Sequence, residues 1–371
     1  MATTAEYLSE KTTTLESTKP VPPAQARAAQ IPLQSFTLPT FPKEAFTSGL
    51  EALILTADIK LDDYQSLLIP EQYSIPDLPS TITSLTLELF SLGYPPGFLK
   101  TLGEKLPKLK SLTIYSQLFG GTSNESRDDA IKFIDGQSSL QELHLLDVFA
   151  PAGFFTSLAD AVEPSLRFLE INYTYRHSDP KFLDTVPSKE LSSFVENCSQ
   201  LVGLTVSIST PDITDDADDI EGTEVGLRPV EKEADVQKMR KALVEKGPAK
   251  LFALDLTMFV LRPSEVGMLL EAQKGLQFLA FTVAIESCDG LAEIVGILGM
   301  GEALEVVEVV GVPGTRLVQK LKEGKNIDVA PDQLDHLARR CPNLRSVKCS
   351  ILRTKVIEWK REAGDNKWVK I

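Results

Sequence analysis

A six-residue pattern, apolar-x-x-apolar-x-apolar, recurs ten times along the 371 residues and constrains the fold more than any other feature. The first apolar residues of the copies are Leu50, Ile82, Leu109, Leu140, Leu166, Leu201, Leu251, Leu276, Leu304 and Leu344. Successive copies are 25 to 50 residues apart. Self-similarity at such a period indicates a repeat protein, in which each unit packs mainly on its neighbours.

Between the copies the apolar residues change from a strand-like to a helix-like spacing. Helical segments are predicted at 96–102, 126–134, 189–195 and 333–338, and Pro263 and Pro331 stand at two further helix starts. Strands that alternate with helices through short connections form parallel sheets with right-handed crossovers. The pattern therefore predicts an α/β solenoid of about ten parallel strands backed by helices.

The ten copies, and the Cys341-Pro342-Asn343-Leu344 start of the last one, resemble the leucine-rich repeat family in its long, irregular subclass. This subclass includes ribonuclease inhibitor and the repeat regions that accompany an F-box. The resemblance covers about residues 50–350 and implies a horseshoe-shaped solenoid. The family often has Asn or Cys three residues after the pattern, whereas this chain has mostly other residue types: Asp58, Phe90, Gln117, Val148 and Thr174.

Three domains are expected from the composition. Residues 1–32 contain few large apolar side chains and are predicted to be disordered. The solenoid is predicted at 33–352, opening with an edge strand at 33–38 and a short helix at 42–48. Residues 353–371 alternate on both sides of Gly364-Asp365-Asn366, which indicates a capping hairpin.

The solenoid contains an acidic insertion at 210–236. Ten acidic residues and two basic ones lie between Asp212 and Asp235, giving −8 of the chain's net charge of −14. A block of like charges repels itself, so a mobile loop is expected. A calcium loop is not indicated, because Ala217 stands where the first ligand of an EF-hand would be.

The overall charge disfavours two classes of partner. A net charge of −14 opposes binding to nucleic acid, and it equally opposes binding to an anionic membrane surface. The acidic N-terminal region does not fit a signal peptide or a mitochondrial presequence, and the four cysteines are not arranged in pairs. We therefore expect a cytoplasmic or nuclear monomer.

No motif for a reaction, cofactor or metal is found. The histidines are His144, His177 and His336, and none has metal-ligand spacing. The glycines at 296, 299 and 301 follow a helical pattern, which favours a packing role over phosphate binding. Cys198 and Cys341 each precede the first leucine of a copy by three residues, which indicates a buried structural position. The chain is therefore expected not to be an enzyme and to need no cofactor.

If the apolar residues of each strand point toward the helices, the intervening residues lie on an open, concave face. Small Thr and Ser are the commonest residues among them. The third to fifth copies differ, because aromatic and polar side chains would cluster there: Tyr115, His144, Leu146, Phe168, Glu170 and Asn172. Such a mixture is typical of an interface centre, although a solvated strand face with aromatic pairs is the alternative. The same register predicts the cross-strand pairs His144–Glu170 and Glu308–Lys348.

Repeat proteins of this kind bind partners on extended concave surfaces. We therefore expect a non-enzymatic scaffold that binds a protein or peptide. The resemblance leaves one alternative, a substrate-recognition subunit of a cullin-type ubiquitin ligase with a missing or degenerate F-box. Residues 38–44 faintly resemble an F-box opening, but the repeats begin too soon after them for a complete one.

Overall fold

The structure is a computed structural model of the chain. The residues that it describes are 28–31, 49–56, 75–88, 94, 97–116, 118–121, 123–148, 152–162, 166–174, 188–209, 230–248, 250–325, 327–351, 355–361 and 367–371. They group into two compact units, one up to Gln200 and one from Leu201 onward. The sequence suggested one continuous solenoid, and the division between the units falls immediately before its sixth copy, which begins at Leu201.

The described part of the first unit contains six strands, and each pairs in parallel with the next. They are β1 (Ala28–Ile31), β2 (Ala52–Thr56), β3 (Ser84–Glu88), β4 (Ser111–Tyr115), β5 (Glu142–Leu146) and β6 (Phe168–Thr174). The five copies of the pattern in this unit form β2 to β6. Their second apolar residues are register partners in succession: Leu53, Leu85, Leu112, Leu143 and Leu169. The predicted strands and their register are confirmed here.

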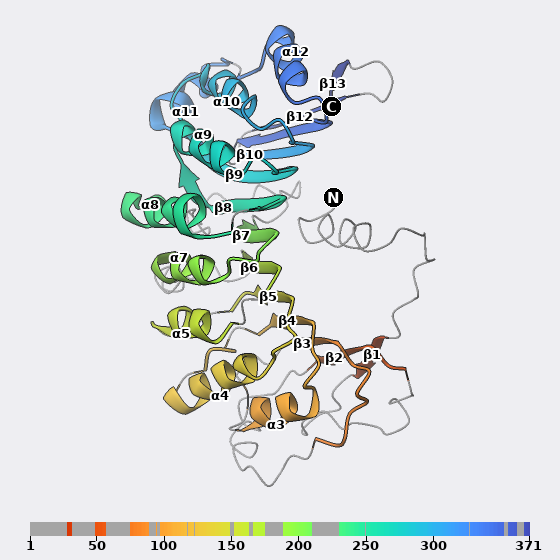
Figure 1. Cartoon of the computed structure of the whole chain (residues 1–371). Helices are drawn as coiled ribbons and strands as arrows, with labels where there is room; N and C mark the ends of the chain where they lie inside the picture. Colours follow the sequence, from red (N-terminus) through yellow and green to blue (C-terminus); the bar gives the residue numbers. More distant parts are fainter. Residues whose placement is uncertain are drawn as a thin grey trace. The chain divides into compact units, whose positions relative to one another are not determined.

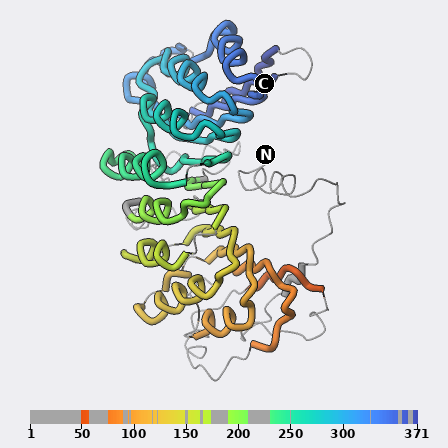
Figure 2. The backbone as a smooth tube through the Cα atoms, viewed as in Figure 1, coloured from red at the N-terminus to blue at the C-terminus, as the bar shows by residue number. Residues whose placement is uncertain are grey.

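Among the described residues, four helices alternate with these strands and lie to one side of them (Figure 1). They are α3 (Phe98–Lys105), α4 (Asn124–Asp135), α5 (Phe154–Ala161) and α7 (Ser188–Asn197). From β3 to β6 the backbone passes from strand to helix and back (Figure 2). Between the layers, aromatic rings follow one another from repeat to repeat at centroid separations of 5.3 to 6.4 Å: Tyr94, Phe98, Phe119, Phe154, Phe155 and Phe194.

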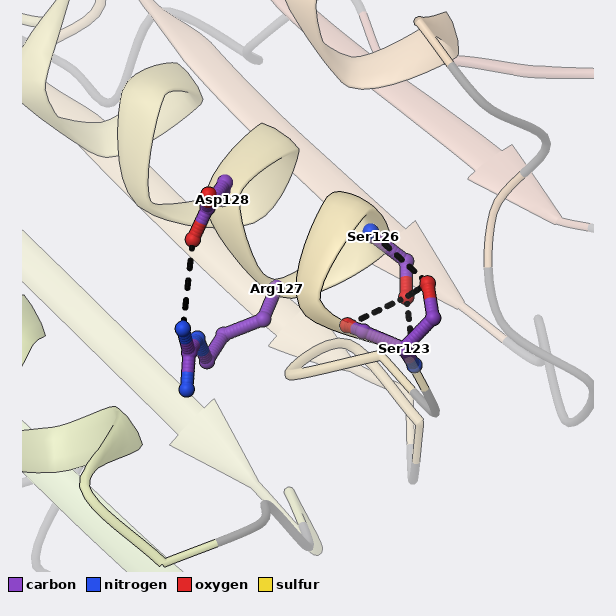
Figure 3. A network of polar contacts seen from close by, with 4 residues as sticks. All are labelled: Ser123, Ser126, Arg127 and Asp128. Carbon is purple, nitrogen blue, oxygen red and sulfur yellow. Dashed lines mark hydrogen bonds and ion pairs between the residues drawn. The ribbon is translucent and has the colours of Figure 1, made fainter.

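Helix α4 begins with a cap made by its own residues (Figure 3). The Ser126 N–H donates to Ser123 Oγ at 3.2 Å, and the Ser123 N–H donates to Ser126 Oγ at 3.1 Å. Arg127 contacts Asp128 on the first turn, with Nη2 and Oδ1 3.5 Å apart. The reciprocal serine bonds satisfy two backbone groups that have no partner inside the helix.

Helices α3 and α5 begin differently. Each follows a glycine in the left-handed region, Gly97 (φ 76°) and Gly153 (φ 87°), and neither glycine can supply a side-chain cap. The caps come from the following helix. Asp129 of α4 accepts the Lys100 N–H at 3.3 Å, and Glu190 of α7 accepts the Gly153 N–H at 2.7 Å and the Thr156 N–H at 3.3 Å. Neighbouring repeats of this unit are therefore joined by hydrogen bonds as well as by apolar contacts.

The described part of the second unit contains seven strands: β7 (Gly203–Ser209), β8 (Ala253–Leu261), β9 (Phe278–Ile285), β10 (Val306–Pro313), β11 (Ser346–Ile351), β12 (Lys355–Arg361) and β13 (Trp368–Lys370). β7 to β11 are parallel and arise from the other five copies of the pattern. β12 and β13 are antiparallel, as predicted for the terminal hairpin. Trp359 is buried, and Trp368 Nε1 donates to the Leu334 carbonyl of the last helix at 3.1 Å.

The helices of this unit are α8 (Glu233–Lys241), the π-helix η4 (Ala242–Lys246), α9 (Pro263–Ala272), α10 (Gly290–Leu298), α11 (Thr315–Lys322) and α12 (Pro331–Arg340). The two proline starts are confirmed. Both helices are capped from within, because the Arg262 N–H donates to Glu265 Oε2 at 2.8 Å and the Ala330 N–H to Gln333 Oε1 at 3.1 Å. Among the described helices of the chain, none is long and apolar enough to cross a membrane.

The three apolar positions of all ten copies are at most 3% exposed. Cys198 and Cys341 are fully buried, as their shared position predicted, and burial raises the pKa of their thiols to about 12 and about 11. The predicted packing role of the glycines at 296, 299 and 301 is confirmed only in part. A Cβ at Gly301 would come within 2.6 Å of Leu304, which requires a glycine, whereas a Cβ at Gly296 would meet open space.

Two predicted boundaries differ from the structure. The acidic insertion was expected to extend to residue 236, but Val230 pairs with Phe259 and α8 begins at Glu233. The reason is the helical spacing of the buried Val236 and Met239, whose burial orders this segment in spite of its charge. An edge strand does pair with β2 at Ala28–Ile31, within the segment expected to be disordered, whereas the edge strand expected at 33–38 lies outside the described residues. The remainder of the acidic insertion, the short helix and His177 lie outside the described residues.

Candidate functional site

The candidate site is the face of β2–β6 that is opposite the helices, called here the open face. Three residues from each strand form three rows across it. The rows are Ala52, Ser84, Ser111, Glu142 and Phe168; Ile54, Thr86, Thr113, His144 and Glu170; and Thr56, Glu88, Tyr115, Leu146 and Asn172. On β2 to β5 these side chains are partly exposed, while the residues between them are buried.

At the centre of the open face, His144 and Glu170 form the pair that the register predicted. His144 Nδ1 and Glu170 Oε2 are 2.8 Å apart. Their side chains are 21% and 11% exposed, so the contact is largely shielded from water. A hydrogen bond between two ionisable groups is stronger when it is charged, and shielding also strengthens it. The pair therefore fixes the imidazole on β5 against β6.

The other predicted site residues are brought together, but they are not equally accessible. Leu146 is the register partner of both Tyr115 and Asn172, and all three are partly exposed. Phe168 stands in the first row beside Glu142, but it is only 6% exposed. Tyr115 is therefore the accessible aromatic residue of the predicted set, and Phe168 belongs to the interior.

Two carboxylates of the open face were not among the predicted site residues. Glu88 is the register partner of Tyr115, and Glu142 lies one strand beyond Ser111. Both are partly exposed. Within the described part of the chain, neither forms an ion pair. The strand register was the signal that could have added them, because it places both in the rows that contain the predicted residues.

Beyond the last row, the backbone leaves β5 in an unusual conformation. Asp147 is a non-glycine residue with φ of 54°, and its N–H donates to the Asn172 carbonyl at 2.7 Å. On the neighbouring strand, Tyr173 Oη donates to the Val148 carbonyl at 2.9 Å. Burial raises the pKa of Tyr173 above its ordinary value, so the phenol stays protonated and keeps donating. These bonds hold the C-terminal ends of β5 and β6 in place beside Leu146 and Asn172.

The corresponding face of the second unit is different. On β7 to β9 most of its residues are buried, and Thr257 of β8 is partly exposed. The following are at most 6% exposed: Thr205, Ser207, Ala253, Asp255, Phe278, Ala280 and Thr282. On β10 and β11 the alternate residues are again partly exposed, and Glu308 and Lys348 are register partners as predicted. His336 lies on α12 and is exposed, as expected for a solvated residue.

A shallow depression of about 390 Å³ lies elsewhere in the first unit, between residues 77–82 and 104–108. Lys105 forms an ion pair with Asp77 at its wall. None of the predicted site residues lines it.

The open face presents a phenol, an imidazole, an amide and carboxylates on a sheet surface, which suits recognition of a partner's side chains.

No model of a known protein family matches the sequence, and no curated protein matches it either.

Proposed function

We propose that the chain is a leucine-rich repeat solenoid that acts as a non-enzymatic scaffold, and that it binds a protein or peptide partner on the open face of β2–β6. The observation that supports this most is the accessible sheet surface around Tyr115. Helices cover the other face of these strands, and the alternate residues of β2 to β5 remain partly exposed. A twisted sheet that is open on one side offers an extended, preformed surface for a partner.

The chemistry of the open face also supports binding. Tyrosine supplies a large contact area with only two side-chain torsions, and it is enriched at the energetic centres of interfaces. The pair of His144 and Glu170 is already ordered, so binding does not have to immobilise it. Leu146 and Asn172 add an apolar and an amide group beside Tyr115. The register places these groups within a few strand spacings of each other.

The ubiquitin-ligase alternative depends on residues before Gly49, most of which lie outside the described part of the chain. No contact of the described residues favours it over a simple scaffold. We therefore retain the scaffold as the proposed function.

Affinity capture with the full chain, followed by affinity measurements on the captured partner, tests this proposal. Tyr115→Ala and His144→Ala should each weaken binding by more than about 1 kcal/mol, which is about fivefold. Lys132→Ala, at an exposed position of α4, is the matched control and should leave the affinity unchanged. A partner that binds all three variants equally well would place the binding surface outside the open face.

A further inference from the structure

The geometry points to a basic peptide as the occupant of the open face. Specifically, β2–β6 would take an extended segment of a partner that carries two lysine or arginine side chains. This inference rests on the proposed function and names the chemistry of the partner.

The open face has an excess of negative charge. Its fifteen positions contain three glutamates, one histidine and no lysine or arginine. His144 is hydrogen-bonded to Glu170, so this glutamate already has a partner on the sheet. Glu88 and Glu142 remain, and neither pairs with a cationic side chain in the described part of the chain. Partly buried carboxylates that lack a counter-ion favour a partner that supplies one.

The residues beside Glu88 can contact a cationic side chain. It is the register partner of Tyr115, so the two side chains emerge side by side from β3 and β4. Neighbouring strands place such side chains about 5 Å apart. A lysine or arginine seated there would meet the carboxylate and could also lie over the phenol ring, which attracts cations. Leu146, on the other side of Tyr115, can contact the aliphatic stem of the same side chain.

The separation of the two carboxylates determines the spacing of the two cations on the peptide. Glu88 lies in the last row of β3, and Glu142 lies in the first row of β5. Two strand spacings across and four residues along amount to about 16 Å between their Cα atoms. An extended peptide advances about 3.3 Å per residue and points alternate side chains to the same face, so it would present its two cations about four or six residues apart. Such a peptide would cross the open face diagonally and pass over Thr113.

The same charges argue against other occupants. Phosphate groups of a nucleic acid and acidic peptide segments would both be repelled by Glu88 and Glu142. A purely apolar segment would leave both carboxylates covered and without a partner, which is unfavourable. Among segments that could bind this surface, a basic one has the smallest free-energy cost of burial, because it gives the carboxylates a partner.

A selection experiment tests the inference. A library of random twelve-residue peptides displayed on phage is selected against the full chain. The same selection is made against Glu88→Gln/Glu142→Gln and against Glu104→Gln/Glu125→Gln. The second double variant removes the same charge from exposed positions of α3 and α4. Thermal unfolding of all three proteins verifies that they are folded.

We expect peptides selected on the unchanged chain to be enriched in lysine and arginine at two positions about four or six residues apart, following the rise and the side-chain alternation of an extended strand. Their affinity should fall at least tenfold on Glu88→Gln/Glu142→Gln and by less than threefold on the helix control. Selected peptides that contain no basic residues would overturn the inference. If such peptides also fail to bind the Tyr115→Ala variant, the proposed function is left intact. Basic peptides that bind both double variants alike would overturn it as nonspecific attraction. A failure to select any peptide would count against both proposals.

Discussion

Strands β3 to β5 of the first unit and β7 to β9 of the second are built from the same six-residue pattern, yet their faces opposite the helices differ. In β3 to β5 the alternate residues are partly exposed, and they include Glu88, Tyr115, Glu142 and His144. In β7 to β9 most of the equivalent residues are at most 6% exposed, and most of these are small. The face is a surface in one region and part of the interior in the other.

The same comparison extends to the helices. In the first unit, α3 and α5 begin after left-handed glycines and are capped by an acid from the following helix. In the second unit, α9 and α12 begin with proline and are capped by their own third residue. Helices α3 and α5 therefore depend on their neighbours for initiation, while α9, α12 and the serine-capped α4 do not. The difference shows that one repeat pattern can be stabilised by two kinds of polar contact.

The largest expected effect tests which face of each strand is buried. Leu143→Ala in the first unit and Leu254→Ala in the second should each lower the free energy of unfolding by about 2–5 kcal/mol, because both leucines are completely buried. Thr113→Ala, on the open face beside His144, should cost less than about 0.5 kcal/mol. Chemical denaturation measures all three, and equal costs at positions 113 and 143 would contradict the assigned faces.

Thr282→Ala tests the difference in burial between the two units. Thr282 is fully buried on the face where Thr113 is partly exposed, and its Oγ1 donates to the Thr257 carbonyl at 2.7 Å. Losing this bond in the interior should cost about 1–3 kcal/mol. The comparison is made with Thr113→Ala in the same denaturation assay. If both threonines can be replaced without loss, the two faces do not differ as described.

Glu190→Ala tests the dependence of one repeat on the next. It removes the cap of α5 although Glu190 belongs to α7, and loss of a helix cap typically costs about 1 kcal/mol. Glu190→Gln keeps an oxygen acceptor and should retain part of that stability. Hydrogen exchange should report faster exchange at the start of α5 in the alanine variant. Faster exchange confined to α7 would show that the contact is not a cap.

The smallest expected effect is a pH dependence at Asp129. Burial raises the pKa of this carboxyl above 3.8 and outweighs the backbone N–H groups of α3, which lower it. A carboxyl with a raised pKa favours the folded state at low pH, and that contribution is lost as the pH rises through its folded value. Asp129→Asn keeps an oxygen acceptor without the charge. It should therefore gain stability relative to the unchanged chain between about pH 3 and pH 7, as measured by urea unfolding. A relative loss over this range would mean that the charged cap dominates.

Much of the architecture could be predicted from the sequence, because strand pairing follows the repeat. All ten strands and the pair of His144 and Glu170 follow from aligning the copies. The burial of Phe168, Thr205 and Thr282 could not be predicted, since it depends on what lies over a face and not on alternation within a strand. The acid caps at α3 and α5 were also missed, because they join residues 29 to 37 positions apart.

The central claim is that partners bind on the open face of β2–β6. Thr113 lies at its middle, partly exposed, and Glu104 lies on the exposed side of α3. A photoreactive phenylalanine analogue placed at either position, in the otherwise unchanged full chain, would cross-link to whatever lies against it. We expect a partner obtained by affinity capture to cross-link from position 113 and not from position 104. Cross-linking from position 104 alone would contradict the account and place the partner on the helices.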